Sequence, residues 1–174
     1  MSEGDQQGDG SRSVQLCEVR GETSVFIGAE INAQGSLVVS GQDIGKMPEE
    51  YWGDADYEYW VVVSRKHMDK LRRALTEREF GGDDLSWRSI RKLLFPLFRT
   101  VFEDLPIDRE AFARFLTSKG IAFDENSGAI AEEQKDALVL ALMERAFGGS
   151  TKAETDFREF LKSKRIPYQF DSWI

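Results

Sequence analysis

The chain has 174 residues, of which 41% are hydrophobic, and a formal net charge of −8, as expected for one globular domain with a sizeable core. The negative charge disfavours nucleic acid as a partner, and the longest apolar run, at residues 93–97, is far too short to span a bilayer. Cys17 is the only cysteine, which excludes an intrachain disulfide and favours a reducing compartment. We therefore expect a cytoplasmic protein that is not an integral membrane protein.

The first residues are polar and lack the basic head and apolar stretch of a secretory signal. We expect residues 1–12 to form a disordered tail and residues 13–174 to form a single α+β domain. Residues 14–63 are mainly β, because short runs rich in branched and aromatic residues alternate with turn residues. Strands are expected at residues 14–19, 24–31, 36–41 and 57–63, and turns at residues 32–35 and 41–45.

After Ser64 the apolar residues recur at helical spacing, with Ser64 as a candidate N-cap and Gly81-Gly82 as the stop. Asp108 is the candidate cap of a later helix, and Pro96 is expected to kink the one before it. These further helices are expected at residues 87–103, 108–119, 130–147 and 151–164, with short strands at 121–123 and 166–170. The sequence thus predicts an α+β fold, with an antiparallel sheet of about five or six strands packed by about five helices.

Two segments of the chain resemble each other. Residues 68–82, MDKLRRALTEREFGG, align with residues 135–149, KDALVLALMERAFGG. Farther on, six residues match six others: Phe112, Phe115, Leu116, Ser118, Lys119 and Ile121 with Phe157, Phe160, Leu161, Ser163, Lys164 and Ile166. We interpret this as an internally duplicated helix, Gly-Gly turn, helix and strand unit.

The first unit is expected at residues 65–123 and the second at residues 131–170. An insertion at about residues 83–105 interrupts the first. Most matched residues are of the kind that two packed helices need, so core packing accounts for the aromatic positions. The repeated pairs Glu77-Arg78 and Glu144-Arg145 are adjacent in sequence and cannot bridge along their own helix. A bridge between the copies is one interpretation of them.

Three further motifs are a Gly-Gln-Asp-x-Gly segment at Gly41 to Gly45, a YEYW strand at Tyr57 to Trp60 and IPYxFxSW at Ile166 to Trp173. In these the chain resembles a group of small bacterial cytosolic proteins with no established activity. The resemblance covers the β half, the first helix and the C-terminal unit. It implies a compact α+β domain of bacterial, cytosolic origin and assigns no active site.

The sequence offers little for a metal, a cofactor or a nucleophile. His67 is the only histidine, and we expect it to be exposed in a first helical turn, whereas Cys17 lies on an apolar strand, so the two make a poor catalytic pair. Asp54, Asp56 and Glu58 have calcium-loop spacing, but Gly and Glu are missing from the sixth and twelfth places. The Gly41 to Gly45 segment lacks the lysine of a phosphate loop. We expect neither a metal nor a cofactor.

The insertion combines aromatic and basic side chains. Between Arg65 and Arg99 there are ten basic and five acidic residues, although the whole chain is acidic. Aromatic and arginine residues anchor many protein interfaces, so we expect partner-binding residues here. They are Trp87, Arg88, Arg91, Lys92, Phe95 and Phe98. A core helix with a solvated basic edge is the alternative, and a membrane-surface or nucleic-acid-binding helix using Arg88, Arg91, Lys92 and Arg99 ranks last.

The function expected from these features is that of a non-catalytic protein-binding or regulatory module of a bacterium, of the kind that includes toxin-neutralising immunity proteins. The alternative is a small hydrolytic or other enzyme that uses acidic residues in a pocket near residues 43–60. Its carboxylates would be Asp43, Glu49, Glu50, Asp54 and Asp56, and its lining Tyr51, Trp52 and Tyr59. The partner and the oligomeric state stay open.

Overall fold

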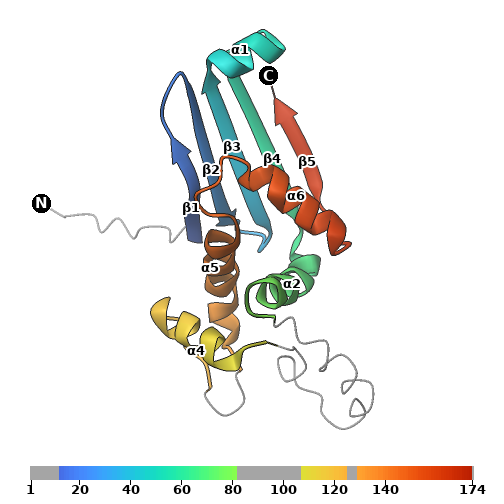
Figure 1. Ribbon diagram of the computed structural model, residues 1–174. Helices are drawn as coiled ribbons and strands as arrows, with labels where there is room; N and C mark the ends of the chain where they lie inside the picture. The colour runs from blue at the N-terminus through green and yellow to red at the C-terminus, as the bar shows by residue number, and fades with distance from the viewer. Residues whose placement is uncertain (1–11, 82–106, 125–128, 174) are drawn as a thin grey trace, which may run out of the picture.

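The computed structural model describes residues 12–81, 107–124 and 129–173, and it shows the predicted α+β class (Figure 1). A single antiparallel sheet has five strands, within the predicted number, and the described residues also form five α-helices. The strands are β1 (Arg12–Val19), β2 (Thr23–Ile31), β3 (Leu37–Gly45), β4 (Asp56–Val63) and β5 (Gln169–Trp173). The helices are α1 (Lys46–Trp52), α2 (Met68–Phe80), α4 (Arg109–Ser118), α5 (Lys135–Phe147) and α6 (Ala153–Ser163).

The strand order β1-β2-β3-β4-β5 follows the chain, so the first four strands form a meander and the C-terminal strand joins its far edge. At the β2–β3 connection, the side-chain Oδ1 of Asn32 accepts hydrogen bonds from the backbone N–H groups of Gln34 and Ser36, each at 3.0 Å. Gly35 has a φ of 73°, which favours glycine. The sequence-predicted turn is therefore confirmed.

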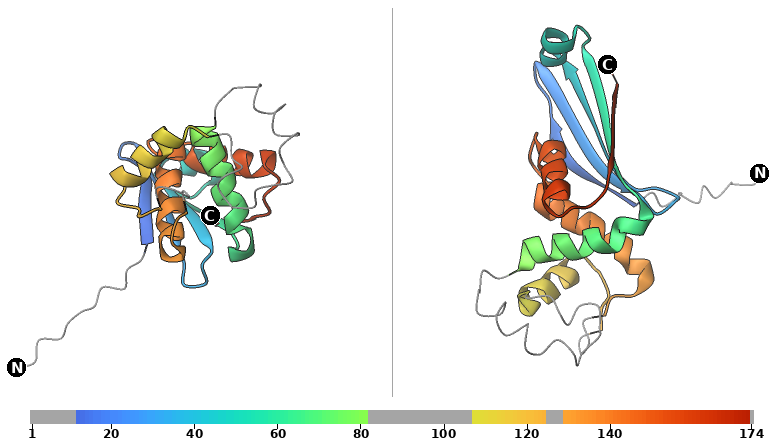
Figure 2. Two further views of the ribbon diagram at one scale, coloured as in Figure 1. Left: turned by 90° about the horizontal axis from the view of Figure 1, so that it is seen from below. Right: turned by 90° about the vertical axis from the view of Figure 1, so that its right-hand side faces the viewer.

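Helices α5 and α6 lie on one face of the sheet, here called the inner face (Figure 2). Helix α5 packs against β1 and β2, α6 packs against β3, and α2 packs against α5 beyond the end of the sheet. Alternation along each strand places the apolar side chains inward, as in Ile27, Val39 and Val61, which are fully buried. The helices cover the end of the sheet that carries the β2–β3 turn and leave the opposite end, where α1 lies, uncovered (Figures 1 and 2).

The two aligned segments make matching contacts with each other. The guanidinium of Arg78 in α2 lies 4.4 Å from the ring centroid of Phe147 in α5. In return, the guanidinium of Arg145 in α5 lies 4.9 Å from the ring of Phe80 in α2. Both arginines thus stack on the aromatic residue that ends the other helix, which is a favourable cation–π geometry. The duplication itself stays a prediction.

Lysine–glutamate ion pairs also join the two aligned segments. Lys164 after α6 pairs with Glu77 in α2 at 3.3 Å, and Lys119 after α4 pairs with Glu144 in α5 at 2.5 Å. The adjacent Glu-Arg pairs of the sequence therefore do reach the other segment, but each member has its own partner there. Two short 3-10 turns, η1 (Arg65–His67) and η2 (Glu132–Gln134), precede α2 and α5 at equivalent places.

Several local predictions need correction. Residues 41–45 form no tight turn but are the last five residues of β3. Ser64 precedes η1 and makes no side-chain capping bond, whereas Asp108 caps α4 as predicted by accepting from Ala111 N at 2.9 Å. The expected helix at residues 87–103 lies outside the described residues.

The two short strands predicted after helices also differ from expectation. The segment at 121–123 forms only an isolated bridge between Phe123 and Ile130. Its counterpart after α6 does join the sheet, but β5 begins at Gln169 instead of Ile166. Arg165 has a φ of 53°, and Pro167 has no N–H to donate to a ladder, so pairing starts beyond them. The 121–123 segment follows α4, which packs on α2 beyond the end of the sheet (Figure 1), so it does not reach a sheet edge.

Candidate functional site

Two rows of inward-facing side chains cross the sheet near its uncovered end. Register places Val19, Val25, Asp43 and Tyr57 opposite one another on β1, β2, β3 and β4. The neighbouring row, nearer the helices, consists of Cys17, Ile27, Gly41 and Tyr59. A carboxyl group thus stands in an otherwise apolar and aromatic row of the inner face.

Gly41 and Tyr59 fit together across β3 and β4. A Cβ atom at Gly41 would lie 2.1–2.3 Å from ring and hydroxyl atoms of Tyr59, so the phenol ring lies directly over the glycine backbone. Any larger residue would displace the ring. Glycine is needed here because it leaves room for an aromatic ring on the inner face, and Tyr59 is consequently buried.

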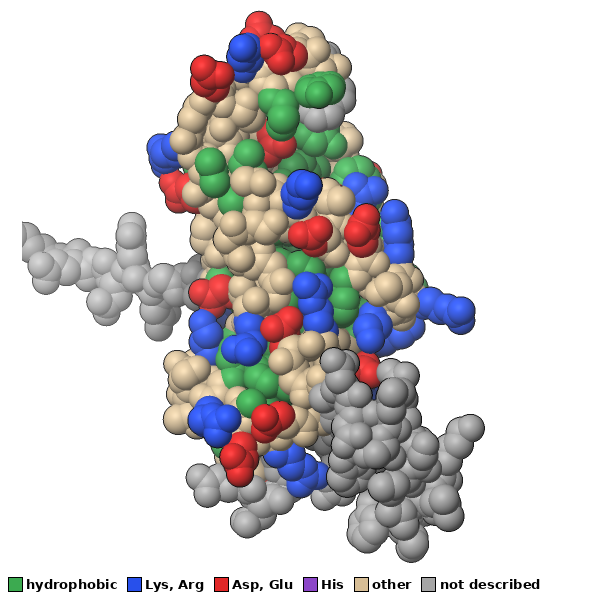
Figure 3. Space-filling view, in the orientation of Figure 1, with side chains coloured by type: hydrophobic (Ala, Val, Ile, Leu, Met, Phe, Trp, Pro, Cys, Tyr) green, Lys and Arg blue, Asp and Glu red, His purple; other side chains and the backbone are tan. Residues whose placement is uncertain are grey.

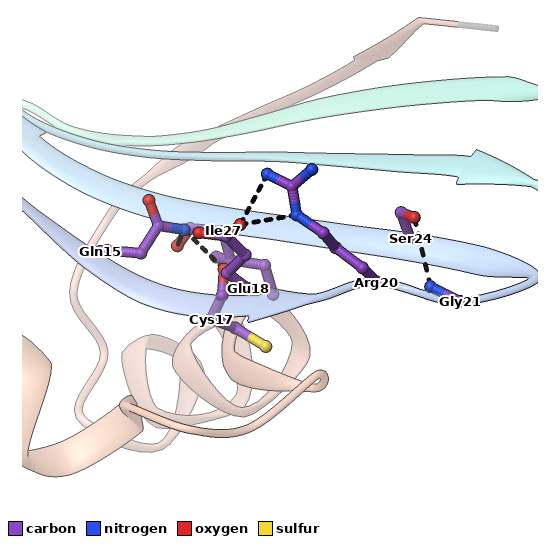
Figure 4. A network of polar contacts seen from close by, with 7 residues as sticks. All are labelled: Gln15, Cys17, Glu18, Arg20, Gly21, Ser24 and Ile27. Carbon is purple, nitrogen blue, oxygen red and sulfur yellow. Dashed lines mark hydrogen bonds and ion pairs between the residues drawn. The ribbon is translucent and has the colours of Figure 1, made fainter.

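A β-bulge in β1 sets the position of Cys17. The register shifts between Gln15 and Cys17, so Leu16 is an extra residue and both Leu16 and Cys17 are buried. The side-chain amide of Gln15 donates to the carbonyl oxygens of Cys17 and Ile27 at 2.5 and 2.9 Å, which spans the bulge (Figure 4). The carbonyl oxygen of Leu16 accepts from Gly149 N at 2.7 Å, which ties the α5–α6 connection to this edge.

Asp43, like Arg158 with its buried Nε atom, has a buried side-chain atom without a hydrogen-bond partner among the described residues. Asp43 itself is half-buried, and the atom concerned is its Oδ1. Burial, and after it the nearby Glu154 carboxylate of α6, raises the pKa of Asp43 above its usual value. The ionised form of Asp43 is thus held in a site that offers it little stabilisation.

Unlike Asp43, Glu154 has a charged partner. Its side chain is 12% exposed and its Oε1 atom lies 2.9 Å from the guanidinium of Arg158, one helical turn farther along α6. The same guanidinium lies 3.8 Å from the ring centroid of Phe170 in β5, so it is held from two sides. The three charged groups Asp43, Glu154 and Arg158 carry two negative charges and one positive charge when all are ionised.

The thiol and the phenol beside Asp43 are poor nucleophiles. Burial raises the pKa of Cys17, and the nearby Asp43 raises it further. For the same reasons, with burial again the larger, the pKa of Tyr59 is strongly raised. Both groups are therefore protonated at neutral pH. His67 lies in η1, away from β1 in the chain, and Cys17 is the buried thiol that the sequence predicted.

Exposed apolar side chains lie at the same end of the sheet, where α1 packs against β2, β3 and β4. Val19, Met47 and Tyr51 are 43%, 41% and 74% exposed. Met47 and Tyr51 are four residues apart and so lie on one side of α1. Figure 3 shows hydrophobic side chains gathered on the inner face at the α1 end of the sheet. We call the surface formed by Val19, Asp43, Met47, Tyr51 and Tyr57 the open end.

Helix α1 is held firmly over the sheet end by its N-terminal residues. Met47 N donates to Thr23 Oγ1 at 2.9 Å, and Lys46 N donates to the carbonyl oxygen of Glu22 at 3.1 Å. Gly45 has a φ of 124°, and a Cβ there would lie 2.3 Å from the oxygen of Glu22. This second glycine of the segment at 41–45 therefore allows the close approach of α1 to the β1–β2 hairpin.

The carboxylates of the enzyme hypothesis do not all share one face of the fold. Asp43 faces inward, whereas Asp56 and Glu58 occupy even-numbered strand positions on the outer face and accept from the side-chain amide of Gln42 at 3.0–3.3 Å. Glu50 pairs with Lys46 at 3.6 Å on α1, and Asp54 accepts from Asp56 N in the loop. Of the lining residues, Tyr59 lies inward, and Tyr51 and Trp52 belong to α1.

Other predicted sites can be placed only in part. The six proposed partner-binding residues, Trp87, Arg88, Arg91, Lys92, Phe95 and Phe98, lie outside the described residues. Within residues 12–81, 107–124 and 129–173, no group of three or more His, Cys, Asp or Glu side chains is arranged to hold a metal ion. In that same part of the chain, no helix is both long and apolar enough to cross a membrane.

Four of the five residues of the open end lie within residues 43–60, the stretch in which the sequence suggested a pocket, whereas Val19 and the nearby Glu154 and Arg158 come from distant segments that no local pattern connects to it. Comparisons with protein-family models, curated proteins and solved structures find no match. The site must therefore be interpreted from its own geometry. Alternation in β3 was the one signal available, since Asp43 shares the parity of Leu37, Val39 and Gly41, all of which face inward.

Proposed function

We propose that the chain is a non-catalytic recognition protein that binds a segment of another protein at the open end. The observation that carries this proposal is the pairing of exposed apolar side chains with a half-buried carboxyl whose Oδ1 atom lacks a partner among the described residues. An apolar surface around a few oriented polar groups is the common composition of a binding site.

Binding fits these residues better than catalysis. Asp43 and Asp56, two of the carboxylates in the enzyme hypothesis, lie on opposite faces of the sheet, and the thiol and phenol next to Asp43 are held in their protonated forms. In its specific form, the proposal is that this chain is a bacterial regulatory or immunity-type protein whose acidic surface binds a basic partner, as its net charge of −8 suggests. The complex with a basic partner is then expected to weaken as salt is added.

Two matched variants test the proposal. Met47 on α1 and Ile44 on the outer face are 41% and 39% exposed, so Met47→Asp and Ile44→Asp introduce the same charge at equal exposure on different surfaces. A photocrosslinking amino acid is placed at Tyr51 in the parent and in both variants, and a lysate of the source organism is irradiated with each.

We expect one protein to crosslink in the parent and in Ile44→Asp but not in Met47→Asp, while circular dichroism shows all three folded. Crosslinking of the same protein in all three, or of none in the parent, would contradict binding at the open end. A crosslinker placed at Trp60, on the outer face, serves as the positional control.

A further inference from the structure

We infer that the segment bound at the open end presents a lysine or arginine side chain, flanked by apolar residues, whose cation pairs with Asp43. This inference rests on the proposed function and specifies the chemistry of the partner. The geometry behind it is the cross-strand row Val19, Val25, Asp43 and Tyr57, in which a carboxyl is bordered by apolar and aromatic side chains.

The charge balance around Asp43 calls for one additional cation. Arg158 lies 2.9 Å from Glu154 and packs on Phe170, so it serves the second carboxylate and not the first. The buried Oδ1 of Asp43 has no donor among the described residues. Leaving a half-buried charge without a partner is costly, and a cation that arrives with a ligand removes that cost.

The neighbours of Asp43 suit the shape of a long basic side chain. Lysine and arginine have aliphatic stems that pack on apolar surface while the charged group reaches a polar partner. Val19 and Val25 on one side and Tyr57 on the other supply that apolar surface, and the Tyr57 and Tyr59 rings lie 5.6 Å apart. The exposed Met47 and Tyr51 on α1 would contact the apolar residues flanking the cation.

Anionic ligands do not fit the same position. The carboxylate of Asp43 borders this surface and that of Glu154 is near enough to raise its pKa, so a phosphate or a nucleic-acid backbone would be repelled. The group also falls short of a metal site, because no set of three or more metal-binding side chains occurs in the described part of the chain. A cation carried on an apolar peptide satisfies both the charge and the surroundings.

The test is a selection from a random 12-residue peptide display library on the immobilised full-length parent, repeated on Asp43→Asn and Met47→Asp. We expect lysine or arginine next to apolar residues to be enriched on the parent. On Asp43→Asn the apolar residues should remain enriched without the basic one. Met47→Asp should enrich neither.

A thermodynamic cycle on the best parent-selected peptide gives the decisive readout. The peptide and its norleucine variant, which lacks only the charge, are titrated against the parent and Asp43→Asn by calorimetry. For a charge-assisted contact, we expect the charged peptide to bind the parent about tenfold or more tightly than it binds Asp43→Asn, and the norleucine peptide to bind both equally. Ile44→Asp should bind like the parent.

The outcomes separate the two proposals. Peptides that need Met47 but show no basic enrichment and no coupling to Asp43 would overturn the cation inference and leave binding at the open end standing. Peptides that bind the parent and Met47→Asp equally, or no enrichment on any of the proteins, would overturn both. Thermal unfolding of each variant shows whether a loss of binding comes from a loss of fold.

Discussion

Asp43 occupies a strand position whose row neighbours are Val19, Val25 and Tyr57. The carboxylate of Glu154 in α6 acts on it electrostatically, and Asp43 in turn acts on the thiol of Cys17 and the phenol of Tyr59. Burial and the like charge both favour the protonated form. The consequence for stability follows from the difference between the folded and unfolded states.

The raised pKa of Asp43 predicts a pH-dependent cost to the fold. Below the unfolded-state pKa of about 3.9 the carboxyl is protonated in both states and costs nothing, whereas stability is lost as pH rises through the higher folded-state pKa. Asp43→Asn should therefore be more stable than the parent at pH 7, with the difference shrinking as the pH falls toward 4.

Urea unfolding followed by circular dichroism between pH 4 and pH 8 measures this difference. The exposed Glu50→Gln on α1 is the control and should track the parent at each pH, because its side chain is 62% exposed. An Asp43→Asn protein less stable than the parent at pH 7 would show that the carboxylate is stabilised in the fold.

Gly41 gives a second test at the scale of one residue. A Cβ at this position would overlap the Tyr59 ring, so Gly41→Ala should destabilise the fold by roughly 1–3 kcal/mol through overpacking. Gly28 in β2 is the control, because a Cβ there has its nearest neighbour at an ordinary 3.7 Å. In a Tyr59→Ala background the cost of Gly41→Ala should disappear; an unchanged cost would mean that the ring is not the obstacle.

At the scale of elements, α2 and α5 are joined by the exchange of Arg78 and Arg145. Each stacks on the aromatic residue ending the opposite helix, and both contact Glu79, at 3.4 and 3.2 Å. The side chain of Glu79 is 15% exposed, so it depends on having at least one cation. The two helices are thus linked by a shared carboxylate as well as by packing.

Removing both arginines should cost more than the sum of removing each. Arg78→Met or Arg145→Met alone should destabilise by about 0.5–2 kcal/mol, because the lost stacking is partly exposed and Glu79 keeps one partner. The double variant leaves Glu79 without either arginine. Chemical unfolding of the four proteins measures the coupling, and it should fall when Glu79→Gln is introduced. Strict additivity would contradict a shared role for Glu79.

The same elements show what the sequence could predict. Helices α2, α5 and α6 and strands β1 to β4 follow from the spacing of apolar residues and from turn residues, because those signals are local. The Gly41 to Gly45 segment was wrongly predicted as a turn because it contains two glycines. In the fold, Gly41 makes room for the Tyr59 ring and Gly45 for the backbone of Glu22. The electrostatic effect of Glu154 on Asp43 could not be predicted, since nothing local links β3 to α6.

At the scale of the whole molecule, one layer of helices covers part of one sheet face, and Phe157 lies where the layers meet. It is fully buried in α6, and its ring centroid is 5.3 Å from that of Phe147 in α5. The buried residues form one continuous cluster that includes side chains of the sheet and of α2, α4, α5 and α6. Removing the Phe157 side chain should therefore destabilise the whole fold.

Phe157→Ala should destabilise the protein by roughly 3–5 kcal/mol and lower the unfolding midpoint of sheet and helices together. Phe112→Ala, at the aligned position in α4, should cost less, because α4 packs on α2 beyond the end of the sheet. Far-ultraviolet circular dichroism and tryptophan fluorescence in urea compare the two. Equal costs would mean that contact with the sheet adds nothing at this position.

The β1 bulge affects how this sheet could grow. Strand β1 is one of its two edges, and midway along that edge Leu16 is displaced from the ladder while its carbonyl oxygen already accepts from Gly149 N. An incoming strand would meet an interrupted row of donors and acceptors at this edge. Growth by strand addition is thereby limited to β5, so two copies joined through β5 would form a closed pair and not an extending fibre.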